Sequence, residues 1–203
     1  MNYFKKLVGT KVYLSPINVE DYEKFTEWLA DFEVTVNLTS YGRIIFKNHE
    51  KECLEDISTD NNSFAIVTLA DHKLLGSCGF HNVDTTNRRT EIGIFIGDKE
   101  YWGKGYGSEA LELLLDFGFN IRNFNSVMLA VRAYNQRAIH CYEKIGFQKI
   151  GARREACIFG ERKYDVIYMD LLASEFESKY IGKFLDEKII PKSNRMLLES
   201  RKG

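Results

Sequence analysis

Residues 91–110 read EIGIFIGDKEYWGKGYGSEA, and this stretch joins two different periodicities. Its first part alternates, with Ile92, Ile94 and Ile96 on one face of a predicted strand and Glu91, Gly93 and Phe95 on the other. From residue 105 to residue 121 the apolar residues follow the helical period instead. Between the two parts lies GKGYG, whose glycines permit positive φ angles or a close approach of backbone to a ligand. We therefore predict a strand-to-helix turn that binds an anion with its backbone N–H groups.

Three phosphate-binding motifs compete for this turn. The P-loop pattern GxxxxGK[ST] fails because Gly97 lies one residue too far from Gly103 and because Gly105 replaces the Ser or Thr. The dinucleotide pattern GxGxxG fails as well, since the next apolar run, SVMLAVRA, ends without an acidic residue. The pyrophosphate loop of acyl-CoA-dependent N-acyltransferases, Q/R-x-x-G-x-G/A, is the pattern that fits best.

Composition excludes several classes of protein. The chain has 203 residues, 44% of them hydrophobic and 28% charged, with two prolines, which is typical of a globular domain with or without an appendage. A net charge of -1 provides no general attraction for nucleic acid or for an anionic membrane. The four cysteines are far apart without a CxxC pair, so we expect neither a metal site nor a disulfide scaffold. Without an apolar run of about 20 residues, the chain is expected to be cytoplasmic.

The remaining segments predict an alternation of helices and strands. Amphipathic helices are expected at residues 17–33 and 49–58, and strands at residues 12–14, 63–70, 73–83, 90–97 and 126–133. Asn135 is expected to cap a helix, QRAIHCYEKI, that ends at Gly146 with Phe147 just beyond. Residues 147–159 and 163–172 are expected to form a hairpin around the turn 160–162.

Three motifs in this order resemble the GNAT superfamily of N-acetyltransferases, and more narrowly its ribosomal-protein and spermidine type. Residues 105–108, GYGS, match the end of the pyrophosphate pattern, although Trp102 stands where that pattern has Gln or Arg. Residues 135–147, NQRAIHCYEKIGF, resemble N-x-x-A-x-x-x-Y-x-K-x-G-F. Residues 151–176 resemble the G-x-x-R-E…G…D…L…E-F hairpin of this type.

The resemblance implies an α+β fold. We expect a mixed, mostly antiparallel sheet of about seven strands flanked by about four helices. The acetyltransferase domain is expected over residues 1–175, followed by a basic helical tail over residues 176–203. Two interpretations of the tail stay open, a solvated appendage and a helix that binds a partner.

The resemblance also implies transfer of an acetyl group from acetyl-CoA to a primary amine by direct attack. By the same resemblance, Tyr142 approaches the sulfur of CoA and is the expected proton donor to the departing thiolate. It lies seven residues after Asn135 and so on the same helix face. The alternative is that Tyr142 only completes an apolar face with Ala138 and Ile145.

Glu91 is the candidate general base for the amine. The resemblance implies this role, because acetyltransferases of the ribosomal-protein and spermidine type often carry Glu at this position, near the acceptor amine. The alternative interpretation is that Glu91 is an ordinary exposed acid at the end of a strand. His81 is also a candidate base, but a lone histidine on a strand more often satisfies a local hydrogen bond.

The expected cofactor-binding residues fall into three groups. The resemblance implies that backbone groups of one strand segment pair with the pantetheine arm, that a turn holds the pyrophosphate, and that one helix start contacts the cofactor. In order, these groups are Ile94, Phe95 and Ile96; Trp102, Gly103, Lys104, Gly105, Tyr106, Gly107 and Ser108; and Asn135 and Ala138.

The identity of the acceptor stays open at this stage. Acidic residues in the first helices could attract a cationic amine, or could form ordinary solvated faces: Asp31, Glu33, Glu52, Glu55 and Asp56. A protein N-terminus, a polyamine and an aminoglycoside are all compatible with the sequence, and so is a homodimer. The rival hypothesis is a non-catalytic acyl-CoA-binding module, which would need neither Tyr142 nor Glu91.

Overall fold

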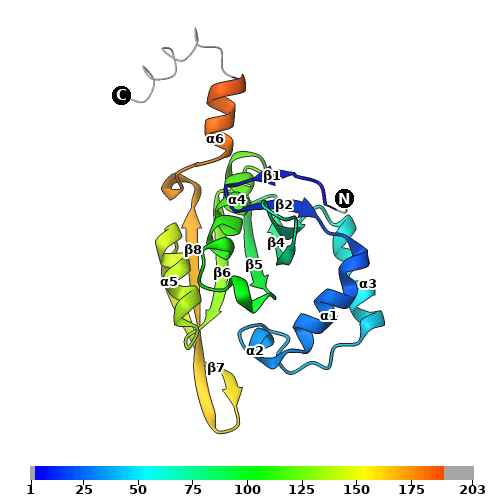
Figure 1. Ribbon diagram of the computed structural model, residues 1–203. Helices are drawn as coiled ribbons and strands as arrows, with labels where there is room; N and C mark the ends of the chain where they lie inside the picture. The colour runs from blue at the N-terminus through cyan, green and yellow to red at the C-terminus, as the bar shows by residue number, and fades with distance from the viewer. Residues whose placement is uncertain (1–2, 190–203) are drawn as a thin grey trace.

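One eight-stranded sheet organises the chain, of which the computed structural model describes residues 3–189 (Figure 1). The strand order is β1-β2-β3-β4-β5-β6-β8-β7, and every neighbouring pair is antiparallel except β5 and β6. The strands are β1 Leu7–Val8, β2 Val12–Pro16, β3 Ser63–Thr68, β4 Leu74–Asp84, β5 Arg89–Ile96, β6 Ser126–Arg132, β7 Gln148–Phe159 and β8 Arg162–Leu172. The mixed, mostly antiparallel sheet is confirmed. The strand beyond the seven expected is β1, which is too short to show a period of its own.

Helices cover both faces of this sheet. They are α1 Tyr22–Ala30, α2 Phe32–Thr35, α3 Lys47–Thr59, α4 Tyr106–Asn120, α5 Gln136–Ile145 and α6 Ile181–Phe184. The helix expected over residues 17–33 is divided, because Asp31 is extended and its carboxylate accepts a hydrogen bond from the Glu33 N–H to cap α2. The expected hairpin of β7 and β8 is confirmed.

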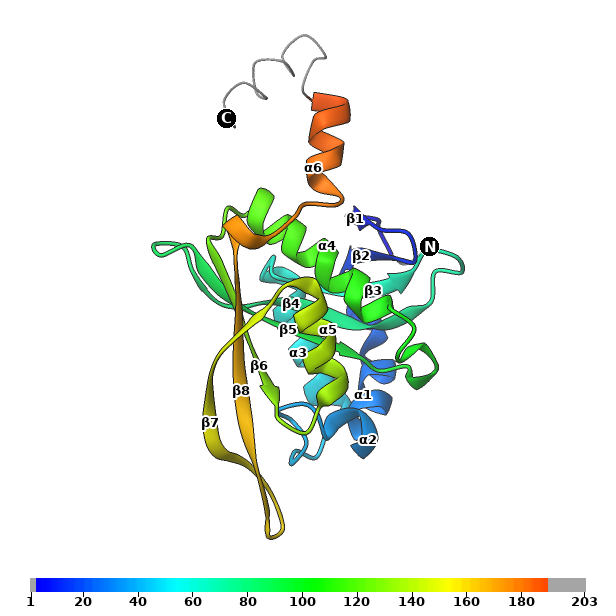
Figure 2. The same ribbon diagram turned by 90° about the vertical axis from the view of Figure 1, so that its left-hand side faces the viewer.

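The alternation in β5 separates two cores. Ile92 is buried in a cluster with α4 and α5, where Ile94 and Ile96 also pack. Phe95 points to the opposite cluster, with its ring centroid 5.7 Å from that of Phe25 and 6.4 Å from that of Trp28 on α1. Figure 2 shows α4 and α5 together on one face of the sheet. The two faces predicted for β5 are therefore confirmed.

The sheet opens between β5 and β6. These parallel strands pair from Arg89 opposite Ser126 only as far as Glu91 opposite Met128. Beyond this point β5 continues to Ile96 along β4, while β6 continues to Arg132 along β8. The edge of residues 92–96 that faces β6 therefore carries backbone groups that no longer pair with that strand.

A buried carboxylate of α4 binds the chain that follows β8 through hydrogen bonds. Asp116, fully buried in α4, accepts hydrogen bonds from Ser178 Oγ at 2.6 Å, Tyr180 N at 2.8 Å and Ile181 N at 3.0 Å. From this anchor α6 projects away from the sheet (Figures 1 and 2). The domain boundary after residue 175 stays a prediction, and the last part of the expected tail, residues 190–203, lies outside the described residues.

Within the part of the chain that the structure describes, every helix is too short or too polar to cross a bilayer.

Candidate active site

The glycine turn forms the start of α4. Gly105 caps the helix with φ +86°, and Gly103 has φ +70°, both in the left-handed region that residues with a side chain rarely adopt. The strand-to-helix turn expected at residues 103–107 is thus confirmed. Because α4 has 15 residues, its first N–H groups and the positive end of its dipole converge on this turn.

The turn packs directly against the open part of β5. A Cβ at Gly107 would lie 3.5 Å from Ile96 Cγ1 and 3.9 Å from Ile94 Cδ1, which is ordinary van der Waals contact. The Ser108 hydroxyl lies 3.1 Å from the Cys141 thiol of α5. The first turn of α4 therefore joins β5 and α5 around the opening between β5 and β6.

The Trp102 side chain makes its polar contact within the turn and packs under a cation. Its Nε1–H donates to the Ile96 carbonyl oxygen at 2.7 Å, so its one hydrogen-bond donor is already used. The guanidinium of Arg137 lies 4.3 Å from the centre of the indole ring. Arg137, in the first turn of α5, thus places a guanidinium beside the position at which the pyrophosphate pattern has Gln or Arg. Sequence reasoning missed Arg137, although it follows the Asn135 cap by two residues.

Both ends of α5 are capped as expected. The Asn135 side chain accepts a hydrogen bond from the Ala138 N–H at 3.2 Å. At the other end Gly146 has φ +119°, and the Phe147 N–H donates to the Tyr142 carbonyl oxygen at 3.0 Å. These caps fix the length and position of the helix that carries Asn135, Ala138 and Tyr142.

Tyr142 is half-buried beside the core that α4 and α5 share. Burial, with a smaller contribution from the neighbouring Cys141 thiol, raises the pKa of Tyr142 to about 12. Its phenol is therefore protonated throughout the neutral range and can donate a hydrogen bond or a proton.

Glu91 lies where the two central strands separate. It is the last residue of β5 that pairs with β6, opposite Met128, and its partner on β4 is His81. By alternation its side chain shares the face of Phe95, the side of the sheet covered by α1. The His81 ring lies over Gly93, with Nε2 only 2.8 Å from the place that a Cβ would take. Gly93 thus leaves room for His81 beside Glu91.

The acidic residues of the first helices are partly neutralised. Lys99 pairs with Asp31 at 2.8 Å and with Glu33 at 2.7 Å. Glu52, Glu55 and Asp56 are exposed on α3. Their attraction for a cationic acceptor stays a prediction.

The far end of the opening is closed by contacts that sequence reasoning missed. Tyr134 Oη donates to the Val36 carbonyl oxygen, and Arg132 Nη2 donates to the Leu38 carbonyl oxygen at 3.0 Å. The Tyr41 ring meets Phe159 of the β7–β8 hairpin at 4.8 Å between centroids. The loop between α2 and α3, the end of β6 and the hairpin thereby form one wall.

Metal ligands do not gather in the described part of the chain. Among residues 3–189 no group of three or more His, Cys, Asp or Glu side chains is placed to hold a metal ion.

Comparison with known proteins agrees with this geometry. Residues 11–148 match the acetyltransferase (GNAT) domain family. The uncharacterized N-acetyltransferase p20 of Bacillus licheniformis is 31% identical over 174 residues, which cover 84% of this chain and 97% of that protein. YdaF of Bacillus subtilis (strain 168), which is named as a ribosomal N-acetyltransferase, is 26% identical over 166 residues, which cover 82% of this chain and 87% of that protein.

A solved structure shows the same fold. Spermidine N-acetyltransferase from Vibrio cholerae, in complex with CoA and spermine, superposes with a TM-score of 0.73 at 23% identity, covering 82% of this chain and 98% of that one. The chain therefore belongs to the GNAT family of acetyltransferases. It is an N-acetyltransferase, and its cosubstrate is acetyl-CoA.

The glycine turn provides a matched pair of substitutions. Gly105→Ala forces a methyl group onto a backbone with φ +86°, whereas Gly107→Ala places one in ordinary contact. We expect Gly105→Ala to weaken acetyl-CoA binding about five- to thirtyfold, by a strain of about 1–2 kcal/mol in the turn, and Gly107→Ala to weaken it less. Isothermal titration calorimetry measures both. Equal affinities for the two variants would contradict the role of the Gly105 conformation.

Proposed function

We propose that this enzyme moves the acetyl group of acetyl-CoA directly to a primary amine, the acceptor being a polyamine or a protein N-terminal amine. The single observation that carries the proposal is the opening between β5 and β6, which has an anion-binding turn at one end. An extended pantetheine arm can pair with the backbone of Ile94, Phe95 and Ile96 as an added strand would. Residues 102–108, with Arg137 beside them, then hold the diphosphate.

The chain supplies a proton acceptor and a proton donor on opposite layers of the sheet. An alkyl amine with a pKa near ~10 is mostly protonated at neutral pH and must lose a proton before its nitrogen can attack. Glu91 accepts that proton on the side of α1. As the carbon–sulfur bond breaks, Tyr142 donates its phenol proton to the departing thiolate from the side of α5. Backbone N–H groups of β5 polarise the thioester carbonyl oxygen.

The proposed cofactor-binding residues lie around the opening between β5 and β6. Asn135 and Ala138 form the cap of α5, and Arg137, which lies between them in the same first turn, carries its guanidinium over the Trp102 ring. Lys104 adds a positive charge within the glycine turn. A binding module would need this cradle but neither proton-transfer residue, and the presence of Glu91 and Tyr142 beside the opening favours the enzyme.

The proposal is tested by release of free thiol from acetyl-CoA across an amine panel. The panel contains spermidine, spermine, an aminoglycoside, free amino acids and peptides with ribosomal-protein N-termini, and mass spectrometry locates the acetyl group. We expect turnover with a polyamine or a peptide N-terminus. Tight acetyl-CoA binding with no acceptor giving release above hydrolysis would contradict the catalytic proposal and favour a binding module.

Tyr142→Phe removes the donor and keeps the ring. We expect kcat to fall by about 10²-fold, the lower range for general acid catalysis, while the Kd for acetyl-CoA stays within about twofold. Because the pKa of Tyr142 is raised to about 12, the wild-type donor stays protonated up to that range and causes no loss of activity between pH 7 and pH 10. Unchanged turnover in the variant would remove Tyr142 from the chemistry.

Glu91→Gln removes the base without changing the size of the side chain. We expect kcat/KM to fall by about 10²-fold at neutral pH and to rise steadily with pH, because the reaction then depends on amine deprotonated in solution. The exposed Glu20→Gln serves as the matched control and is expected to keep the wild-type profile. If the pH profile of Glu91→Gln matches that of the wild type, another group is the base.

A further inference from the structure

The chain that follows β8 lies along one face of α4. Phe176 packs on Phe119 with 5.1 Å between their ring centroids, and the Asp116 carboxylate binds residues 178–181. The residues of α4 that this segment contacts recur at intervals of three and four and therefore share one helix face: Glu109, Glu112, Asp116 and Phe119. The segment thus runs along α4 toward the end of the helix that carries the glycine turn.

Tyr180 extends this contact to the first turn of α4. Its Oη lies 3.4 Å from Glu112 Oε2 and 3.5 Å from Glu109 Oε1, so the hydroxyl can donate to either carboxylate. Burial, and then the charges of these two carboxylates, raise the pKa of Tyr180, and its phenol therefore keeps its proton. Because the Tyr180 backbone N–H donates to Asp116 at 2.8 Å, the residue is held at both ends.

Glu109 fixes the turn between β1 and β2. Its buried carboxylate accepts hydrogen bonds from the backbone N–H groups of Thr10 at 2.8 Å, Lys11 at 2.7 Å and Val12 at 2.8 Å. Gly9 makes room for this contact, since a Cβ there would lie 2.7 Å from Glu109 Cδ. Burial opposes ionisation of Glu109, but the hydrogen bonds that it accepts prevail and hold its pKa below the ordinary value. The start of β2 is thus locked to the first turn of α4.

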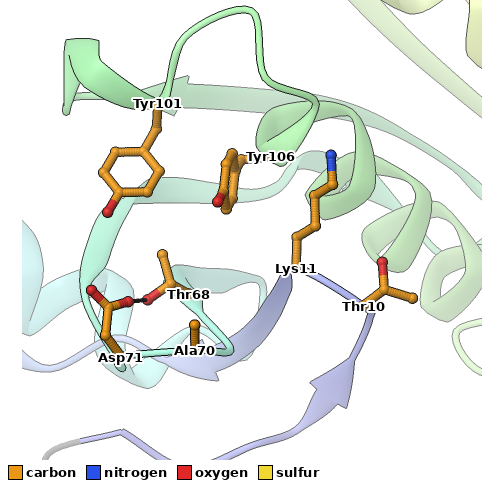
Figure 3. Close-up of a pocket in the computed structure, with 7 residues that line it drawn as sticks. All are labelled: Thr10, Lys11, Thr68, Ala70, Asp71, Tyr101 and Tyr106. Carbon is orange, nitrogen blue, oxygen red and sulfur yellow. Dashed lines mark hydrogen bonds between the residues drawn. The ribbon is translucent and has the colours of Figure 1, made fainter.

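Lys11 connects this locked turn to the glycine turn. Its Nζ donates to the Lys104 carbonyl oxygen at 2.9 Å. Figure 3 shows the Lys11 side chain beside Tyr106, the first residue of α4. The peptide unit between Lys104 and Gly105 is planar and trans, so its N–H points away from its carbonyl oxygen. A contact that fixes the carbonyl oxygen therefore also fixes the direction of the Gly105 N–H.

We propose that the chain after β8 positions the glycine turn for the diphosphate of acetyl-CoA, through Tyr180, Glu109 and Lys11. Lys11 holds the Lys104 carbonyl oxygen on the side of the β1–β2 turn, and the N–H of the same peptide unit is thereby presented to the diphosphate. Because this donor is set before the cosubstrate arrives, binding does not have to order the turn. The inference rests on the proposed function, because it takes the diphosphate at the glycine turn as its starting point.

Isothermal titration calorimetry of acetyl-CoA with two variants tests this positioning. We expect the Kd to rise about fivefold in Lys11→Met and about threefold in Tyr180→Phe, as for the loss of one hydrogen bond each. With an acceptor from the amine panel, the KM for acetyl-CoA should rise likewise while kcat stays unchanged, because neither residue touches the reacting atoms. Lys6→Met makes the same change at an exposed lysine of the same hairpin and should bind as the wild type does.

Two further measurements separate positioning from other roles. Adding Tyr180→Phe to Lys11→Met should weaken binding no further, because the connection to the glycine turn is then already broken. In the free protein, the NMR order parameters of the Gly103 and Gly105 amides should fall in both single variants, before any cosubstrate is present. Circular dichroism melting shows that each variant is folded.

Three results would overturn the proposal. An unchanged Kd in Tyr180→Phe would disconnect the chain after β8 from the site. Additive losses in the double variant would show that Tyr180 and Lys11 act independently. Weaker binding by Lys11→Met with unchanged order at Gly105 would assign Lys11 to the cosubstrate itself. A wild-type chain that does not bind acetyl-CoA at all would instead refute the proposed function, and calorimetry of the wild type distinguishes this outcome from the other three.

Discussion

The structure depends on the separation of β5 from β6 after Glu91 and Met128. Up to that pair the sheet is continuous, and beyond it each strand is held only from its outer side, β5 by β4 and β6 by β8. A sheet that opens in its middle leaves peptide groups of residues 92–96 without their strand neighbour. An extended ligand can fill that place, and α4, α5 and the β7–β8 hairpin are arranged around it.

Because side chains alternate along β5, the proposed base and the proposed proton donor lie on opposite faces of the sheet. Glu91 faces the layer of α1, whereas Ile92, Ile94 and Ile96 face the layer of α4 and α5, where Tyr142 is half-buried. In the proposed acyl transfer the amine loses its proton on one side of the thioester and the thiolate gains one on the other, and this separation provides a group on each side. In the proposed mechanism a single strand, β5, therefore carries the base Glu91 and the backbone groups that pair with the cofactor, and packs against the layer of α5, which carries Tyr142.

Local chemistry made much of this predictable from the sequence. The glycine turn, the Asn135 cap and the Gly146 end of α5 each depend on residues within one turn of the chain, so their geometry followed from residue type. The break at Asp31 was missed because the apolar period continues across it. Lys11, Arg137 and the closure by Tyr134 were missed for another reason. Each makes a contact between segments that are distant in the sequence, such as Lys11 with residue 104 and Tyr134 with residue 36. The periodicity of apolar residues does not predict contacts of this kind.

Hydrogen exchange of β5 on cofactor binding tests this account most directly. With acetyl-CoA bound, amides of residues 92–96 that face β6 should exchange at least about tenfold more slowly, because the pantetheine arm then takes the place of the missing strand. The N–H groups at the start of α4 should be protected as well. Tight binding of acetyl-CoA with unchanged exchange across residues 92–96 would show that the opening is not the cofactor seat.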